Sequence, residues 1–282
     1  MQLVPSKKWL VLFVALSLLF ALGGKPLRAQ EPAKTHTYYI AADEVEWDYA
    51  PSGIDQMMGT PFGPFAKRFT ERGPDRIGKV YRKAIYREYT DETFTTLKPR
   101  PSEWEHLGIL GPLLRAEVGN TIQVVFKNNA SRPYSMHPHG VFYTKSSEGV
   151  PYNDGTSGAD KRDDAVPPGG THTYIWPVPE RAGPGPGDPS SLVWLYHSHV
   201  DEPKDVNAGL VGTIIVSARG TTKPDGTPKD VDREFVGLFM VFDENQSWYI
   251  DHNIQTYAGD PKSIDKGEFI ALDPDGNYAF VG

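Results

Sequence analysis

Histidine occurs eight times in this 282-residue chain, and four of these residues form two short pairs, His137-Pro-His139 and His197-Ser-His199. Random placement would give about 0.2 pairs of this spacing, so two pairs indicate a pattern with a cause. Residues i and i+2 of a β-strand project from the same face, so each pair can present two imidazoles to one side. Two neighbouring strands would then bring four nitrogen donors together, whereas the alternative is two unrelated surface pairs.

Four imidazoles of this kind indicate a metal site. Neutral imidazole binds copper, zinc, iron or nickel, and no thiolate competes because the chain contains no cysteine. The absence of cysteine also excludes disulfides, iron–sulfur clusters, a nucleophilic cysteine and any copper site that needs a thiolate from this chain.

A second group of candidate ligands lies in the loop 145–164. Asp160, Asp163 and Asp164 cluster there, and the backbone carbonyl of Lys145 lies upstream. Calcium accepts such an all-oxygen set of carboxylates and carbonyls. The alternative is an acidic turn that is only solvated, as many runs of charge are.

The elements that position these residues are predicted to be β-strands. Apolar residues alternate with a period of two over residues 37–47, 79–89, 121–127, 171–176 and 209–217, and the chain contains 28 glycines and 25 prolines. Short strands separated by Gly, Pro, Asn and Asp predict a β-sandwich or barrel and exclude a helical bundle. The net charge of -7 argues against nucleic acid as a partner.

The chain divides into an N-terminal leader and two unequal parts. Lys7 and Lys8 precede the apolar run 9–22, which predicts a signal peptide over residues 1–29 and a secreted or periplasmic protein. An uncleaved membrane anchor is the alternative. Residues 219–230 are turn-rich and poor in apolar side chains, which is typical of a linker.

The linker separates a first domain, predicted at 35–218, from the start of an incomplete second domain at 231–282. A strand is expected at 233–242, because this segment is apolar and follows the linker directly.

Six stretches of the sequence carry a resemblance to a known family. They are residues 73–78, 89–94, 107–117, 130–134, 197–210 and 243–249. Together with the two histidine pairs, they resemble the first cupredoxin domain of the multicopper oxidases, and in particular the ceruloplasmin and hephaestin branch. The resemblance covers nearly all of residues 37–257. It implies an all-β fold, a cupredoxin-type Greek-key β-sandwich, followed by the start of a second cupredoxin domain.

The resemblance also implies a role for each histidine. His137 would bind the type 2 copper of a trinuclear cluster, and His139, His197 and His199 would bind the type 3 pair. This is half of the cluster's ligands, so the other half would come from a further cupredoxin domain of the same protein or another subunit. The calcium site of such domains would match the Lys145 carbonyl and three carboxylates, those of Asp160, Asp163 and Asp164.

The activity implied by the resemblance is one-electron oxidation of a reductant coupled to reduction of dioxygen to water. The reductant would be a metal ion such as Fe(II), or a phenol or amine. Glu148 matches the position of a candidate proton donor in the family, and its alternative role is that of a solvated loop carboxylate. The isolated chain would be inactive, because it holds only half of the cluster.

Other functions fit parts of the pattern. A non-catalytic binding module would keep the sandwich, as in coagulation-factor-like relatives, and a copper-sequestering protein would keep the histidines. A cupin would use His172 with one histidine pair, but it needs a Glu where Tyr143 and Thr144 stand. Retention of all four paired histidines favours the oxidase.

Overall fold

A computed structural model describes residues 32–263 of the chain. The predicted signal peptide, residues 1–29, lies outside the described residues. Within residues 32–263, no helix has both the length and the apolar character needed to cross a membrane.

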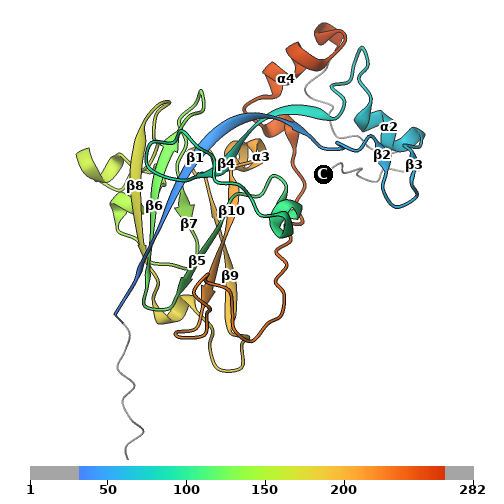
Figure 1. Ribbon diagram of the computed structural model, residues 1–282. Helices are drawn as coiled ribbons and strands as arrows, with labels where there is room; N and C mark the ends of the chain where they lie inside the picture. Colours follow the sequence, from blue (N-terminus) through green and yellow to red (C-terminus); the bar gives the residue numbers. More distant parts are fainter. Residues whose placement is uncertain (1–31, 264–282) are drawn as a thin grey trace, which may run out of the picture. The chain divides into compact units, whose positions relative to one another are not determined.

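Eight strands form two four-stranded sheets that pack against each other (Figure 1). The first sheet has the order β4 (Val80–Tyr89), β1 (Thr35–Asp48), β6 (Thr121–Asn128) and β8 (Thr171–Pro177). The second has the order β5 (Leu113–Glu117), β10 (Val211–Ser217), β9 (Ser191–His197) and β7 (His137–Pro138).

Neighbours in the sheets are mostly not neighbours in the sequence. Strand β1 runs antiparallel to β4 but parallel to β6, with Thr35 opposite Thr121. Strand β10 likewise runs antiparallel to β9 and parallel to β5. The chain therefore crosses repeatedly between the two sheets, and the predicted all-β, cupredoxin-type Greek-key sandwich is confirmed.

The strands form where alternation lets one face be buried. In β6, Ile122, Val124 and Phe126 are fully buried and alternate with partly exposed residues. Strand β10 is buried on both faces: Ile214 packs in the core, while Val211 faces the other way and belongs to a second apolar cluster, against which Val236 packs. Both patterns place the sandwich core between the sheets.

Large aromatic residues fill this core and also hold the loops that carry the candidate site. The hydroxyl groups of Tyr86, Tyr174 and Tyr196 donate to the backbone carbonyls of Ser135, Asp163 and Pro112, respectively. Each ring is at most 1% exposed. A buried tyrosine contributes apolar area and needs a partner for its hydroxyl, so each of these rings fixes a loop to the core.

The remaining elements are short. They are the hairpin strands β2 (Ile54–Asp55) and β3 (Thr60–Pro61), the helices α2 (Pro64–Thr70), α3 (Glu202–Ala208) and α4 (Ile250–Tyr257), and the 3-10 turns η1 (Ser102–Leu107), η2 (Lys145–Ser147), η3 (Gly158–Lys161), η4 (Glu180–Ala182), η5 (Glu244–Gln246) and η6 (Pro261–Ser263).

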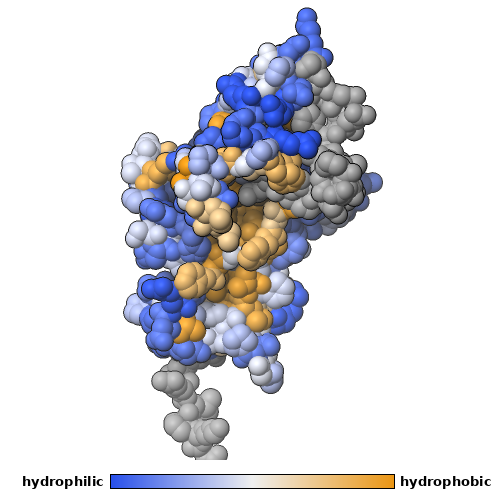
Figure 2. All heavy atoms as spheres, turned by 90° about the vertical axis from the view of Figure 1, so that its right-hand side faces the viewer, coloured by the Kyte–Doolittle hydropathy of each residue, from blue (hydrophilic) through white to orange (hydrophobic). Residues whose placement is uncertain are grey.

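The prediction of a strand at residues 233–242 is wrong. The burial of the segment alternates, because Val236 and Leu238 pack inward while Phe235 and Phe239 are 74% and 100% exposed. However, the segment pairs with no strand in the described part of the chain, and a strand is defined by its partner. Figure 2 shows apolar side chains on the side along which this segment runs. The boundaries of the linker and second domain remain predictions.

Candidate metal centre

The structure brings the four paired histidines together. His137 on β7 lies directly opposite His197 at the end of β9. The ring centroid of His137 is 5.3 Å from those of His139 and His199 and 5.6 Å from that of His197. The Nε2 atoms of His139 and His197 are 2.9 Å apart.

The cluster lies on the outer face of the second sheet. Side chains alternate along β9, so Val193 and Leu195 share a face with His197. These two residues are 62% and 42% exposed, whereas Tyr196 on the opposite face is fully buried in the core. The imidazoles are therefore presented at a partly apolar surface.

Backbone carbonyls orient two of the rings. The Nδ1 atom of His137 lies 2.7 Å from the Glu148 carbonyl oxygen, and that of His197 lies 3.0 Å from the Ser198 carbonyl oxygen. A carbonyl only accepts, so Nδ1 carries the proton in both rings and the lone pair remains on Nε2. This is the arrangement by which a second hydrogen bond prepares a histidine for a metal ion.

Burial keeps these rings in the neutral form that binds metals. Desolvation, aided by the neighbouring histidines, lowers the pKa of His137 to about 4. Desolvation also lowers the pKa of His197. Both imidazoles are therefore uncharged near neutral pH.

Glycine is required at the turn after the first pair. Gly140 has a φ of 78°, and a Cβ atom there would lie 2.3 Å from the Trp194 ring. Trp194 lies on β9 three residues before His197, and its Nε1 donates to the Ala182 carbonyl. The close approach thus packs the turn of the first pair against the strand that carries the second.

Two side chains near the histidines were missed in the sequence. The Tyr143 ring packs edge-on against His137, with centroids 5.5 Å apart. An oxygen of Glu202, in the first turn of α3, lies 3.3 Å from His199 Nε2. The acidic residue three positions after His199 was the available signal.

Glu148, the candidate proton donor, touches the centre through its backbone. Its carbonyl accepts from His137, while its carboxylate lies 3.2 Å from Lys145 Nζ and accepts from the Tyr152 hydroxyl at 3.1 Å. His172 lies elsewhere, with its Nε2 2.9 Å from the Ser146 carbonyl oxygen.

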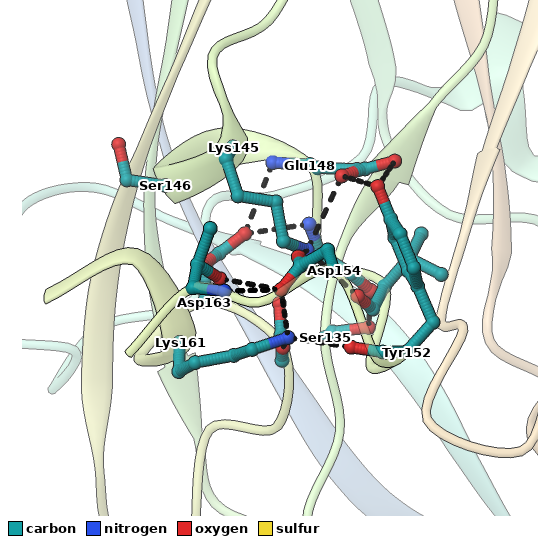
Figure 3. A network of polar contacts seen from close by, with 12 residues as sticks. Ser135, Lys145, Ser146, Glu148, Tyr152, Asp154, Lys161 and Asp163 are labelled. Carbon is teal, nitrogen blue, oxygen red and sulfur yellow. Dashed lines mark hydrogen bonds and ion pairs between the residues drawn. The ribbon is translucent and has the colours of Figure 1, made fainter. Parts of the chain in front are cut away.

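The acidic loop contains two lysine ammonium groups among its carboxylates (Figure 3). Lys145 Nζ lies 2.9 Å from Asp164 and 3.3 Å from Asp154, and Lys161 Nζ lies 3.1 Å and 2.9 Å from the same two residues. Although desolvation raises the pKa of Asp154, hydrogen bonds from Thr156 and both lysines lower it overall. Asp154 was not among the predicted ligands.

The two other predicted carboxylates of the loop differ in their surroundings. Asp163 is fully buried, and its Oδ2 accepts from the backbone N–H groups of Glu148 and Gly149 at 3.0 and 2.8 Å. Its Oδ1 is buried and has no hydrogen-bond partner. Asp160, by contrast, is exposed on η3.

Comparison with known proteins identifies the family. Residues 107–221, which include both histidine pairs, match the family model described as multicopper oxidase. This chain carries a multicopper oxidase domain. The predicted resemblance is confirmed.

Relatives of the multicopper oxidase domain include three named proteins. Human "Ferroxidase HEPHL1" is 52% identical over 84% of this chain, mouse "Hephaestin" 47% over 87%, and human "Ceruloplasmin" 43% over 83%. The chain spans only 20% to 22% of the length of these relatives. A crystal structure of a multi-copper oxidase from Pseudomonas thermotolerans aligns with a TM-score of 0.39 and 20% identity, over 66% of this chain and 30% of that one.

The donor set of the multicopper oxidase domain fits copper. Imidazole nitrogens suit copper, and two of the four rings have their Nε2 lone pairs fixed by carbonyl partners. Within residues 32–263, however, no three His, Asp or Glu side chains already surround a single metal position. The domain thus offers a set of nitrogen donors but no closed metal position among the described residues.

Proposed function

We propose that this chain is the N-terminal part of a secreted, copper-dependent oxidase and supplies half of the ligands of a trinuclear copper site. His137 would bind the type 2 copper, and His139, His197 and His199 the type 3 pair. The observation that carries the proposal is the convergence of four imidazoles at one exposed sheet face.

A further cupredoxin domain would complete the site. Val193 and Leu195 expose apolar surface beside His197, which supports an interface at this place. The partner domain would bring the remaining ligands and the thiolate of a type 1 copper, which this chain, without cysteine, does not hold. Residues 231–282 would begin the second cupredoxin domain.

Bound copper would take electrons singly and pass four of them, with four protons, to dioxygen to give two waters. Fe(II) is the reductant we favour, because one relative is named a ferroxidase. A phenol or an amine is the other class. The chain's own residues would hold the imidazoles neutral and oriented.

We propose that Glu148 donates a proton during the reduction of dioxygen. Its backbone carbonyl accepts a hydrogen bond from His137, and its carboxylate accepts one from the Tyr152 hydroxyl. We expect Glu148→Gln to lower the rate of oxygen reduction by about 100-fold without loss of copper, because a positioned acid contributes about that factor. Loss of copper together with activity would instead assign Glu148 to the structure of the loop.

The copper assignment is tested in the longer protein that contains the partner domains. His139→Ala and His197→Ala should each reduce oxygen consumption with Fe(II) to background and lower the copper content. The matched control for both variants is His252→Ala, which removes an exposed histidine of α4. Oxygen consumption at the parental rate in either site variant would overturn the assignment, and consumption with phenols or amines alone would overturn Fe(II). The isolated chain should show no blue absorbance.

We also propose a calcium site formed by the Lys145 carbonyl, Asp160, Asp163 and Asp164. It is supported by the buried, unpartnered Oδ1 of Asp163. Calcium would have to displace the ammonium groups of Lys145 and Lys161 from Asp164. The double variant Asp163→Ala, Asp164→Ala should lose the rise in melting temperature that calcium causes. Asp225→Ala, in an exposed turn, is the control. An unchanged calcium effect in the double variant would contradict the site.

Export is the third proposal, and it is motivated by Lys7, Lys8 and the apolar run 9–22. Mass spectrometry of secreted protein should find an N-terminus near Gln30. An intact Met1 in the cytoplasmic fraction would contradict it.

A further inference from the structure

One buried serine joins the two histidine pairs. Ser135 is fully buried two residues before His137. Its N–H donates to Ser198 Oγ at 3.1 Å, and its Oγ accepts from the N–H of His199 at 3.0 Å. Ser135 on the first motif therefore bonds to two successive residues of the second.

The same hydroxyl also fixes the loop behind His137. Ser135 Oγ donates to the Gly149 carbonyl at 2.6 Å. The preceding peptide carries the Glu148 carbonyl that accepts from His137 Nδ1, and both backbone N–H groups of this pair bond to Asp163 Oδ2. Figure 3 shows Ser135, Glu148 and Asp163 within this network. One hydroxyl thus contacts the supports of both His137 and His199.

A second buried carboxylate, that of Asp205, accepts hydrogen bonds at the other end of this network. Ser198 Oγ donates to Asp205 Oδ2 at 2.6 Å, and the same oxygen accepts from the N–H of Val200 at 2.9 Å. Asp205 Oδ1 accepts from Trp248 Nε1 at 2.7 Å. Asp205 is fully buried, so these donors take the place of water.

Every hydrogen bond in this network has a defined donor and a defined acceptor. Asp205 only accepts, so the Ser198 hydroxyl must donate to it and is left to accept from Ser135 N–H. The Gly149 carbonyl likewise only accepts, so the Ser135 hydroxyl donates to it and accepts from His199. Each of the two serine hydroxyls thus donates one hydrogen bond and accepts another, and buried hydroxyls satisfied in this way hold a single geometry.

We propose that Ser135 is a positioning residue that sets the spacing and orientation of the pair His137 and His139 relative to the pair His197 and His199. Asp163 and Asp205 are the fixed ends of its network. The inference rests on the proposed function in that the histidines bind copper. Among the described residues, Ser135 forms no hydrogen bond with a ring of the cluster and acts through the backbone of Gly149 and His199.

The test is Ser135→Ala in the longer protein, with two readouts. Copper affinity at this centre should fall by about 10- to 100-fold, as is typical when a group supporting a ligand is removed, and the hyperfine coupling of the type 2 copper should change. After copper is stripped, hydrogen exchange of the peptide containing the His199 amide should accelerate by about tenfold or more, because that N–H loses its acceptor.

Ser217→Ala is the matched control. Ser217 is 1% exposed on β10, and its hydroxyl contacts only that of Ser191 among the described residues. It should leave copper affinity and His199 exchange unchanged. Ser198→Ala should lower copper affinity as Ser135→Ala does, but it removes the acceptor of Ser135 N–H and leaves that of His199 N–H, so exchange should accelerate at the Ser135 amide and not at His199. The double variant should lose less copper affinity than the sum, because the two residues share one network.

The outcomes separate the inference from the proposed function. Parental copper affinity and coupling in both serine variants would overturn the positioning role. If copper binding is insensitive to His139→Ala as well, the copper assignment itself is wrong. In that case the exchange rate of the His199 amide in copper-free Ser135→Ala protein still tests the hydrogen-bond network. A parental rate would overturn the network, and an accelerated rate would support it. Where Ser135→Ala fails to fold, Ser198→Ala decides by copper affinity, by the hyperfine coupling and by exchange of the Ser135 amide, whose acceptor is Ser198 Oγ.

Discussion

Acid should destabilise the metal-free chain through His137. The pKa of this ring is about 4 in the folded chain, against an ordinary value of 6.5. Between these two pH values the unfolded chain binds a proton that the folded chain does not. Stability therefore rises with pH in this window, is fully present above pH 6.5, and is lost as the pH falls toward 4.

The magnitude follows from the size of the pKa difference. At pH 4.5 an unscreened ring of this kind would lose about 2.5 kcal/mol of folding free energy relative to pH 7. Because His137 is only partly buried, we reduce this to about 1 kcal/mol. For a domain of this size, that lowers the melting temperature by about 2 to 4 °C.

The measurement is thermal unfolding in chelator at pH 7 and pH 4.5 for the parent and His137→Asn. Asparagine can still donate to the Glu148 carbonyl but does not titrate, so the variant should lose about 1 kcal/mol less on acidification. The control, His252→Ala, should keep the parental response, because His252 is exposed. The reasoning is refuted by equal pH dependence in the parent and His137→Asn.

Three further predictions concern stability, each measured by urea unfolding. Glu244→Gln removes the charge partner of the fully buried Lys83 and should cost about 3 kcal/mol; a change under 1 kcal/mol would mean that the pair is solvated. Trp248→Phe leaves Asp205 Oδ1 without its indole donor and should cost about 1 to 3 kcal/mol, so a neutral effect would show that water replaces it. Leu114→Ala empties a fully buried core position and should cost about 2 to 5 kcal/mol, whereas a smaller loss would mean that the core collapses around it.

Alternation along the sequence was a good guide to strands that bury one face. Residues 121–127, for example, were predicted as a strand and lie in β6. Strand β9 was not found in this way, because Val193 and Leu195 are apolar residues on its exposed face and mask the period of two. The segment 233–242 shows the converse: it alternates, but it pairs with no strand among the described residues and forms none.

The candidate site was predictable where spacing alone determines which side chains share a face. His137 and His139 were found by spacing, and the fold then brings them to His197. Ser135 and Asp154 carry no such signal, because their roles depend on contacts that no short spacing along the chain determines. Tertiary structure, which no local pattern encodes, decides which serine or carboxylate meets the histidines.

The position of β1 in its sheet has a consequence for when the fold can form. This first strand lies between β4 and β6, and its parallel pairing with β6 closes a loop that contains both β4 and β5. Closing such loops costs chain entropy before contacts repay it, so folds rich in distant pairings fold slowly. During synthesis, the edge of β1 that pairs with β6 stays unpaired until residues 121–128 have left the ribosome. The apolar residues Ile40, Ala41 and Ala42 therefore lie in an incomplete sheet until then. We therefore expect the nascent chain to depend on chaperones over this interval.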